Sequence, residues 1–285
     1  MFLVAMPDGH AGLLSQQLRL RLRTALRYQF QRDMNTPPQF FDTHAHLTDP
    51  DFAADIDKVI ERAAAAGITR IIIPSVDAES SRQAIALSDR FENVFAAVGW
   101  HPNHVDDAPE DVRAEVRELA RHPKVVAIGE TGLDHFHLPS KQGRGATAAD
   151  DLAHQARQAR LFEQHLEVAA ELGLPCVVHQ RACLEPTFAV FEKFAGRVRG
   201  QFHCFADDLA ALERVLALGS WVSFTGILTY KNADNVRAAL QAAPAGRFML
   251  ETDSPYLVPA PHRGAVWTMR RSRTWRVGPR RPRAT

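Results

Sequence analysis

Residues 40–47 of this 285-residue chain read Phe40-Phe41-Asp42-Thr43-His44-Ala45-His46-Leu47. In a β-strand, side chains two residues apart point to the same side, so His44 and His46 share one face. Two neutral imidazoles that converge in this way can bind a divalent metal ion. The pair alone is a weak signal, because two nearby histidines are more often ordinary core or surface residues. The rest of the chain therefore has to support a metal site.

Continuous apolar segments alternate with helical patterns after this stretch. Seven further strands are predicted at 68–74, 94–98, 125–128, 175–178, 198–202, 220–224 and 247–250. Helices are predicted between the strands at 49–66, 78–90, 109–121, 152–172, 185–196, 207–218 and 231–242, with a polar loop over 135–150. Apolar strands that alternate with helices indicate a parallel sheet covered on both faces. Eight such units favour an α/β fold of the (β/α)₈ TIM-barrel type over an open doubly wound sheet.

Charge divides the chain into three parts. Residues 1–36 carry +3 and residues 265–285 carry +7, so the net charge of +1 leaves −9 for residues 37–264. We expect a basic extension, disordered or partly helical, over 1–36, the barrel over 37–264, and a disordered Arg-rich tail over 265–285. The residues after 264 have no apolar helical stripe, so the barrel is expected to lack its regular eighth helix. The acidic centre argues against a broad basic nucleic-acid groove and is compatible with a carboxylate-rich cation site.

The three cysteines and the hydropathy pattern limit the environment of the protein. Cys176, Cys183 and Cys204 show no CxxC spacing and no disulfide framework, which indicates a reducing compartment. No apolar run approaches the length of a membrane span, so no membrane contact is expected.

Side chains with nitrogen or oxygen ligand atoms follow most of the predicted strands. The first strand supplies His44 and His46, the fourth Glu130, the fifth His179, the sixth His203 and the eighth Asp253. The carboxyl ends of barrel strands converge on one mouth, so this set predicts a metal site. Six ligands exceed the four of a tetrahedral ion, which favours two ions or one ion with open positions.

Two carboxylates in this set have predicted roles. Glu130 is placed to bridge two cations, and Asp253 can both ligate a cation and accept the proton of an attacking water. Mixed nitrogen and oxygen ligands suit Zn²⁺, Mn²⁺ or Fe²⁺, whereas Mg²⁺ prefers oxygen.

Three more residues are candidates for substrate contacts. His101 ends the third strand and can bind a phosphate or orient a water, or simply pack at the mouth. Arg181, two residues after His179, is a phosphate clamp or an ordinary surface arginine. Tyr256 can stack on a nucleobase or pack at the barrel rim.

Six segments together resemble the TatD family of metal-dependent deoxyribonucleases, which are amidohydrolase-like barrels. They are Phe41-Asp42-Thr43-His44-Ala45-His46-Leu47, Gly99-Trp100-His101-Pro102, Gly129-Glu130-Thr131-Gly132-Leu133-Asp134, Val178-His179-Gln180-Arg181, His203-Cys204-Phe205 and Glu251-Thr252-Asp253-Ser254-Pro255-Tyr256-Leu257. The resemblance covers about residues 39–264 and is specific in order and spacing.

The resemblance implies that His44, His46, Glu130, His179, His203 and Asp253 are ligands of a one- or two-metal site. It also implies a metal-dependent phosphodiesterase that cleaves DNA, a cytoplasmic location and a monomer. Mg²⁺ is the expected ion, with Mn²⁺ or Zn²⁺ as alternatives. Because the core is acidic, we expect the DNA to enter as a single strand or a strand end, which needs a pocket rather than a long groove.

Two alternatives remain at this stage. The same site can serve a barrel hydrolase of a small phosphoester, amide or lactone, because no segment identifies a base or sugar. The chain can also be a truncated, non-catalytic metal-binding product whose basic tail contacts nucleic acid without specificity.

Overall fold

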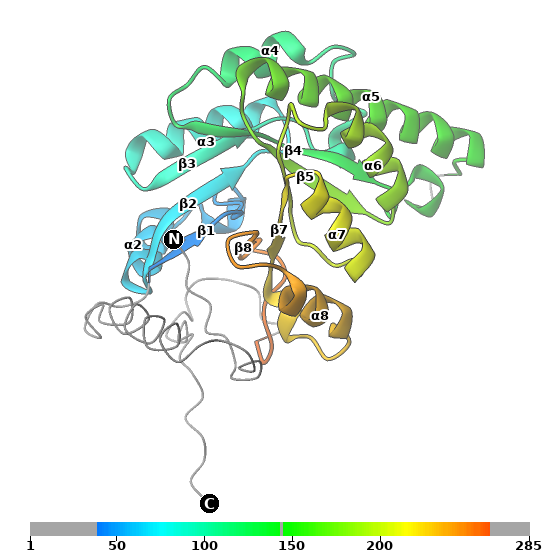
Figure 1. Cartoon of the computed structure of the whole chain (residues 1–285). Helices are drawn as coiled ribbons and strands as arrows, with labels where there is room; N and C mark the ends of the chain where they lie inside the picture. Colours follow the sequence, from blue (N-terminus) through cyan, green and yellow to red (C-terminus); the bar gives the residue numbers. More distant parts are fainter. Residues whose placement is uncertain (1–38, 143–144, 263–285) are drawn as a thin grey trace, which may run out of the picture.

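The computed structural model describes residues 39–142 and 145–262 and confirms the predicted barrel (Figure 1). Eight strands form one sheet in chain order, and every paired neighbour runs parallel. They are β1 (Phe40–Asp42), β2 (Ile68–Pro74), β3 (Val94–Val98), β4 (Val125–Asp134), β5 (Cys176–Arg181), β6 (Gly200–Phe202), β7 (Trp221–Phe224) and β8 (Phe248–Leu250). The extension over 1–36 and the tail over 265–285 lie outside the described residues and stay predictions.

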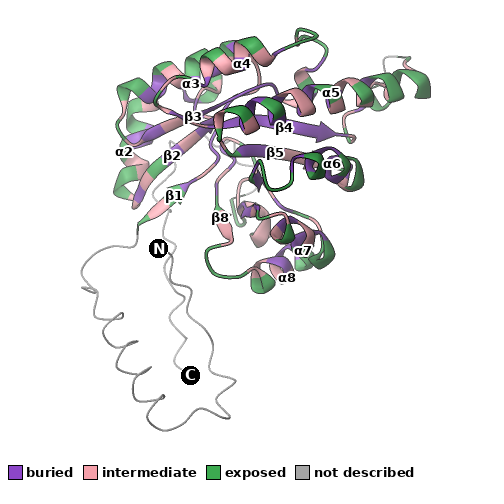
Figure 2. Cartoon of the chain, turned by 45° about the horizontal axis from the view of Figure 1, so that its top comes forward, coloured by how far each residue is buried: buried purple, intermediate pink, exposed green. Residues whose placement is uncertain are grey.

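The predicted helix between each pair of strands is present in the structure. The helices are α2 (Ile56–Ala65), α3 (Ala78–Arg90), α4 (Arg113–Leu119), α5 (Ala148–Leu172), α6 (Leu184–Phe191), α7 (Leu209–Ala217) and α8 (Asp234–Ala242). They surround the strands, with exposed residues on their outer sides and buried residues along the sheet (Figure 2). None of these seven helices is long and apolar enough to cross a membrane.

Several predicted boundaries are wrong. The first strand, expected to include His44 and His46, ends at Asp42. The strand expected over 175–178 continues to Arg181, and the helix expected over 185–196 ends at Phe191. The helix expected over 49–66 begins only at Ile56, because Asp49 caps a short 3₁₀ turn, Pro50–Phe52, instead. The helix expected over 109–121 spans only Arg113–Leu119. The helix expected at 152 begins at Ala148, where Thr147 and Asp150 form a capping box. The strand expected over 125–128 continues to Asp134.

The junction between β8 and β1, here called the seam, closes the barrel differently from the other strand pairs. No ladder joins these two strands in the described part of the chain, and a single parallel bridge pairs Ala45 with Ser254. The backbone N–H of His46 donates to Ser254 O at 2.8 Å, and that of Asp253 donates to His44 O at 2.8 Å. The N–H of Thr43 also donates to Leu250 O, the last residue of β8, at 3.3 Å. The barrel is therefore nearly closed, and it closes mainly through residues just beyond the ends of the two strands.

A polar layer crosses the inside of the barrel. The Gln201 amide donates to Thr43 Oγ1, Ser223 Oγ and Glu251 Oε2 at 3.1, 3.2 and 3.0 Å. Toward the amino-terminal ends of the strands, a cavity of about 380 Å³ is lined mostly by apolar side chains such as those of Phe41 and Met249. The polar layer lies between this cavity and the side chains at the carboxyl ends.

Candidate metal centre

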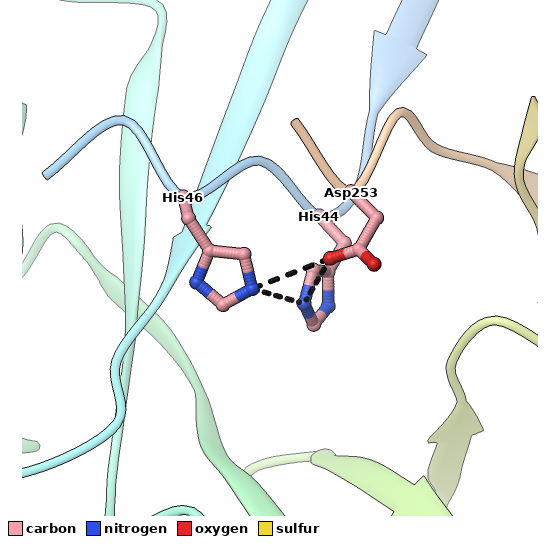
Figure 3. Close-up of side chains that lie close together, drawn as sticks. All are labelled: His44, His46 and Asp253. Atoms are coloured by element: carbon pink, nitrogen blue, oxygen red, sulfur yellow. Dashed lines mark hydrogen bonds and ion pairs between the residues drawn. The ribbon is translucent and has the colours of Figure 1, made fainter. Parts of the chain in front are cut away.

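Residues from the two sides of the seam converge at the carboxyl end of the barrel. His44 and His46 follow β1, and their Nε2 atoms lie 3.2 Å apart (Figure 3). Asp253 follows β8, and its Oδ1 lies 3.6 Å from His44 Nε2 and 3.3 Å from His46 Nε2. The three side chains point toward one another, so their ligand atoms surround one small volume.

A second group lies on the strands opposite the seam. Glu130 Oε1, on β4, is 2.9 Å from His179 Nδ1 and 2.9 Å from His203 Nε2. His101 follows β3, and its Nε2 lies 3.5 Å from the same oxygen and 3.2 Å from His179 Nδ1. His101, predicted only as a substrate contact, therefore lies in direct contact with the predicted ligands.

Glu130 joins the two groups. Its other oxygen, Oε2, lies 3.2 Å from His44 Nε2 and 3.7 Å from His46 Nε2, and the residue is 2% exposed. The structure thus brings all six residues predicted as ligands into one contiguous cluster.

The donor set fits a divalent cation. The facing Nε2 atoms of His44 and His46 can form a hydrogen bond with each other only if one of them carries a proton. A cation between them would instead accept a lone pair from each nitrogen. Neutral imidazole nitrogens and carboxylate oxygens are the usual ligands of Zn²⁺ and Mn²⁺, and the carboxylates also suit Mg²⁺.

Two glycines allow β4 to present Glu130 to this cluster. A Cβ on Gly129 would lie 2.6 Å from Val177 O, and one on Gly132 would lie 2.0 Å from His179 O. Both glycines have positive φ, at 134° and 142°. The register between β4 and β5 shifts in this stretch, so the close approach of the two strands depends on residues without side chains.

Charges within the cluster set its protonation. Burial alone would raise the pKa of Glu130, but His203 and His44 hold it well below its usual value. Burial opposes a charged His203, yet Glu130 outweighs it and raises the pKa of His203 well above the usual range. Burial and His203 lower the pKa of His44. Asp253 is buried, but the hydrogen bond with His46 lowers its pKa, so it is ionised at neutral pH.

Glu251 is a site residue that the sequence prediction missed. It is buried, its Oε1 lies 3.6 Å from His203 Nδ1, and it accepts a hydrogen bond from Cys204 N at 2.6 Å. With His44 and His203 it forms another group that could hold a cation. The available signal was its position two residues before Asp253.

Asp134 supports the cluster from the end of β4. Its Oδ2 lies 3.4 Å from His179 Nε2 and 2.7 Å from His137 Nδ1. Burial opposes the charge, but the hydrogen bonds with His179 and His137 hold the pKa of Asp134 far below its usual value. This carboxylate orients the His179 ring from the side away from Glu130.

The other two predicted substrate contacts lie at the rim. The Arg181 guanidinium lies over the Phe136 ring, with its Cζ 4.2 Å from the ring centre. The Tyr256 ring lies 5.5 Å from that of His46, and its hydroxyl donates to Asp49 Oδ2 at 3.0 Å. Tyr256 is 52% exposed, so part of its ring remains available to a ligand.

Comparisons with known proteins identify the family of the chain. Residues 41–272 match the model of the family described as TatD related DNase. The chain is 34% identical to "Uncharacterized metal-dependent hydrolase YabD" of Bacillus subtilis, covering 79% of this chain and 83% of that protein. It is 33% identical to "3'-5' ssDNA/RNA exonuclease TatD" of Erwinia tasmaniensis, covering 77% and 81%. The crystal structure of the TatD homologue YJJV of Escherichia coli K12 superposes with a TM-score of 0.71 at 29% identity, covering 80% of this chain and 83% of that one.

Proposed function

The chain belongs to the TatD family of metal-dependent hydrolases, and we propose that it uses this centre to cleave phosphodiester bonds of DNA. The observation that carries the proposal is the Glu130 carboxylate, one oxygen of which faces His44 and His46 while the other faces His179 and His203. A carboxylate in this position can hold two cations near each other by offsetting their repulsion. The name of the Erwinia relative, which specifies single-stranded DNA and RNA, supports a nucleic-acid substrate.

The residues that would hold the metal come from both groups. They are His44, His46, Glu130, His179, His203 and Asp253. We propose one or two divalent ions per chain, with Mg²⁺ in use and Mn²⁺ or Zn²⁺ accepted. A bound divalent ion supplies a Lewis acid for the phosphoryl oxygen and lowers the pKa of water.

Asp253 is the proposed general base. Its carboxylate is ionised at neutral pH and lies at the open end of the barrel, where it can accept a proton from the attacking water. His46 holds it in place through the 3.3 Å contact. His101 orients the phosphate or the water beside Glu130, and Arg181 and Tyr256 contact the substrate at the rim.

The form of the substrate follows from charge. Residues 37–264 carry −9 within a chain of net charge +1, so a long duplex would meet a repulsive surface. A single strand or a strand end needs only the local cation site, and we propose that this is the form cleaved. A monomer in the cytoplasm stays our prediction.

The test is metal-dependent cleavage of DNA by the full-length protein. A labelled single-stranded oligonucleotide with Mg²⁺ or Mn²⁺ should be degraded, EDTA should stop the reaction, and Glu130→Ala should lower the rate roughly a thousand-fold, the upper end for one electrostatic contact at a reacting centre. Glu61→Gln, an exposed carboxylate on α2, is the matched control and should keep the wild-type rate.

Activity that survives both EDTA and Glu130→Ala would refute the proposal. A parallel panel of chromogenic phosphodiesters, amides and lactones covers the alternative substrates. If one of these is hydrolysed and DNA is not, the centre is retained and the DNA assignment is wrong.

A further inference from the structure

Phe136 and Arg181 form an exposed aromatic–cation pair beside the metal centre. Phe136 is 50% exposed, and the Arg181 Cζ lies 4.2 Å from its ring centre. The Arg181 guanidinium makes no hydrogen bond or ion pair with the residues that the structure describes. A single exposed phenylalanine is ordinary. What distinguishes this pair from the other cation–aromatic pairs of the described residues is its place beside the predicted ligands.

The backbone fixes this pair relative to the predicted ligands. Asp134 pairs with Arg181 in the β4–β5 register, just beyond Gly132 and His179. The N–H of Phe136 donates to Asp134 Oδ1 at 2.8 Å, and the other oxygen of the same carboxylate lies 3.4 Å from His179 Nε2. Arg181 is two residues beyond His179, about 7 Å along the strand. The strand pairing and this hydrogen bond therefore place Phe136 and Arg181 beside Asp134, which contacts the predicted ligand His179.

We infer that the Phe136–Arg181 pair is a stacking platform for a nucleobase of the substrate. The inference rests on the proposed function and deepens it, because it names the residues that bind an unstacked base of the single strand. An aromatic ring can stack on the face of any base. The arginine adds a positive charge that attracts both the base and the phosphate backbone of the substrate. Arg181 then acts through stacking rather than as the isolated phosphate clamp that the sequence alone predicts.

The test compares two oligonucleotides with the same phosphates, one normal and one abasic. Base stacking contributes about 1–3 kcal/mol, so Phe136→Ala in the full chain should lower kcat/KM for the normal strand about 5- to 150-fold. It should leave kcat/KM for the abasic strand unchanged, and Phe136→Trp should restore the loss. An equal loss on both strands, or none on the normal strand, overturns the inference.

The matched control is the pair at the opposite end of the barrel. Phe41 is 39% exposed, lies under Arg70 Cζ at 5.1 Å and lines the cavity at the amino-terminal ends of the strands, so Phe41→Ala removes a similar ring outside the metal cluster. It should change neither rate, and thermal melts should show both variants folded.

A fluorescence measurement separates the two proposals. If the wild type cleaves neither strand, the proposed function fails, and binding of a 2-aminopurine trinucleotide in Mn²⁺ then tests the platform alone. Quenching by the wild type that Phe136→Ala abolishes supports the platform. Absence of quenching by the wild type, or equal quenching by both proteins, overturns it.

Discussion

Glu130 and His179 lie on β4 and β5, which pair from Ile128 and Cys176 to Asp134 and Arg181, whereas the residues of the seam lie beyond two three-residue strands. Main-chain pairing holds the first side of the centre. Among the described residues, the seam has only three main-chain hydrogen bonds, from Thr43 N to Leu250 O and the two at the Ala45–Ser254 bridge. Side chains add to them, chiefly the Asp42 carboxylate, which accepts hydrogen bonds from Thr252 N at 3.0 Å and Thr252 Oγ1 at 2.7 Å. One side of the ligand set is thus positioned by a longer run of strand pairing, and the other by a few main-chain bonds and side-chain hydrogen bonds, so we expect the two sides to respond differently to perturbation.

The largest expected effect is the loss of β4–β5 pairing. Gly132→Ala places a Cβ 2.0 Å from His179 O at a φ of 142°, so we expect a destabilisation of about 4 kcal/mol or more. Urea unfolding measures it. Gly196→Ala is the control, because its φ is also positive but nothing lies within 4 Å, and it should cost about 1 kcal/mol. Equal losses in the two variants would contradict the dependence on close approach.

Metal removal has the next largest expected effect, and it should destabilise the seam more than the β4–β5 side. A ligand at 100 times its Kd stabilises by about 2.7 kcal/mol. For a barrel of this size that corresponds to a Tm lower by roughly 5–10 °C in EDTA. Hydrogen exchange should accelerate at residues 43–46 and 252–256 more than in β4 and β5. Uniform acceleration across both sides would contradict the comparison.

The metal affinity of the centre should decrease as the pH decreases. Glu130 raises the pKa of His203, and the hydrogen bonds of His179 with Asp134 and Glu130 outweigh burial to raise the pKa of that histidine. Both must be neutral to ligate, so binding releases protons and weakens as the pH decreases. Calorimetric Mn²⁺ titrations in buffers of different ionisation enthalpy measure this release, and a pH-independent affinity would argue against His179 and His203 as ligands.

Asp42 should contribute a smaller amount to the stability of the protein, and should act at the seam. Asp42→Ala leaves Thr252 and His44 N–H groups without an acceptor, so we expect a loss of about 2–3 kcal/mol. Burial raises the pKa of Asp42 to about 7, although the hydrogen bonds from Thr252 act in the opposite direction. The protonated form of Asp42 is therefore populated near neutral pH, and the asparagine of Asp42→Asn has nearly the same shape as that form. Asn should therefore retain most of the stability in the same urea measurement. A loss in Asn as large as that in Ala would show that the negative charge matters instead.

The smallest effect lies on the side away from the seam. His165 is buried on α5, accepts the N–H of Trp100 at Nε2 and faces Leu161 O with Nδ1; burial lowers its pKa to about 4. The unfolded chain, with a histidine pKa of about 6.5, binds more protons between pH 6.5 and 4, so stability falls as the pH decreases through this window. The loss should reach about 2 kcal/mol at pH 5. His165→Gln should remove that part of the pH dependence, and identical profiles for both proteins would exclude His165 as its source.

The difference between the two sides also explains what the sequence could predict. The spacing of His44 and His46 and the position of the other ligand residues directly after apolar strands are local features of the sequence. They were sufficient to predict both the barrel and the convergence of six side chains. Gly129 and Gly132 misled the strand prediction, because glycines near a strand end usually signal a turn, whereas here they permit contact with β5.

Other features depend on contacts between distant segments. The pairing of Ala45 with Ser254, and the bond from Asp42 to Thr252, join the two ends of the described chain and have no local pattern. Phe136 is an exposed ring in a polar loop, and its partner Arg181 becomes evident only when β4 and β5 are in register.

The seam also determines at which point in the synthesis of the chain the metal centre can form. A nascent chain that ends before β8 has the four predicted histidine ligands and Glu130, but neither Asp253 nor the strand that completes the ring. The His44 and His46 pair emerges from the ribosome early and has to wait for nearly the entire barrel to be translated. Under the proposed function, a chain that ends before β8 lacks both the general base Asp253 and the closing strand, so we expect it not to cleave nucleic acid.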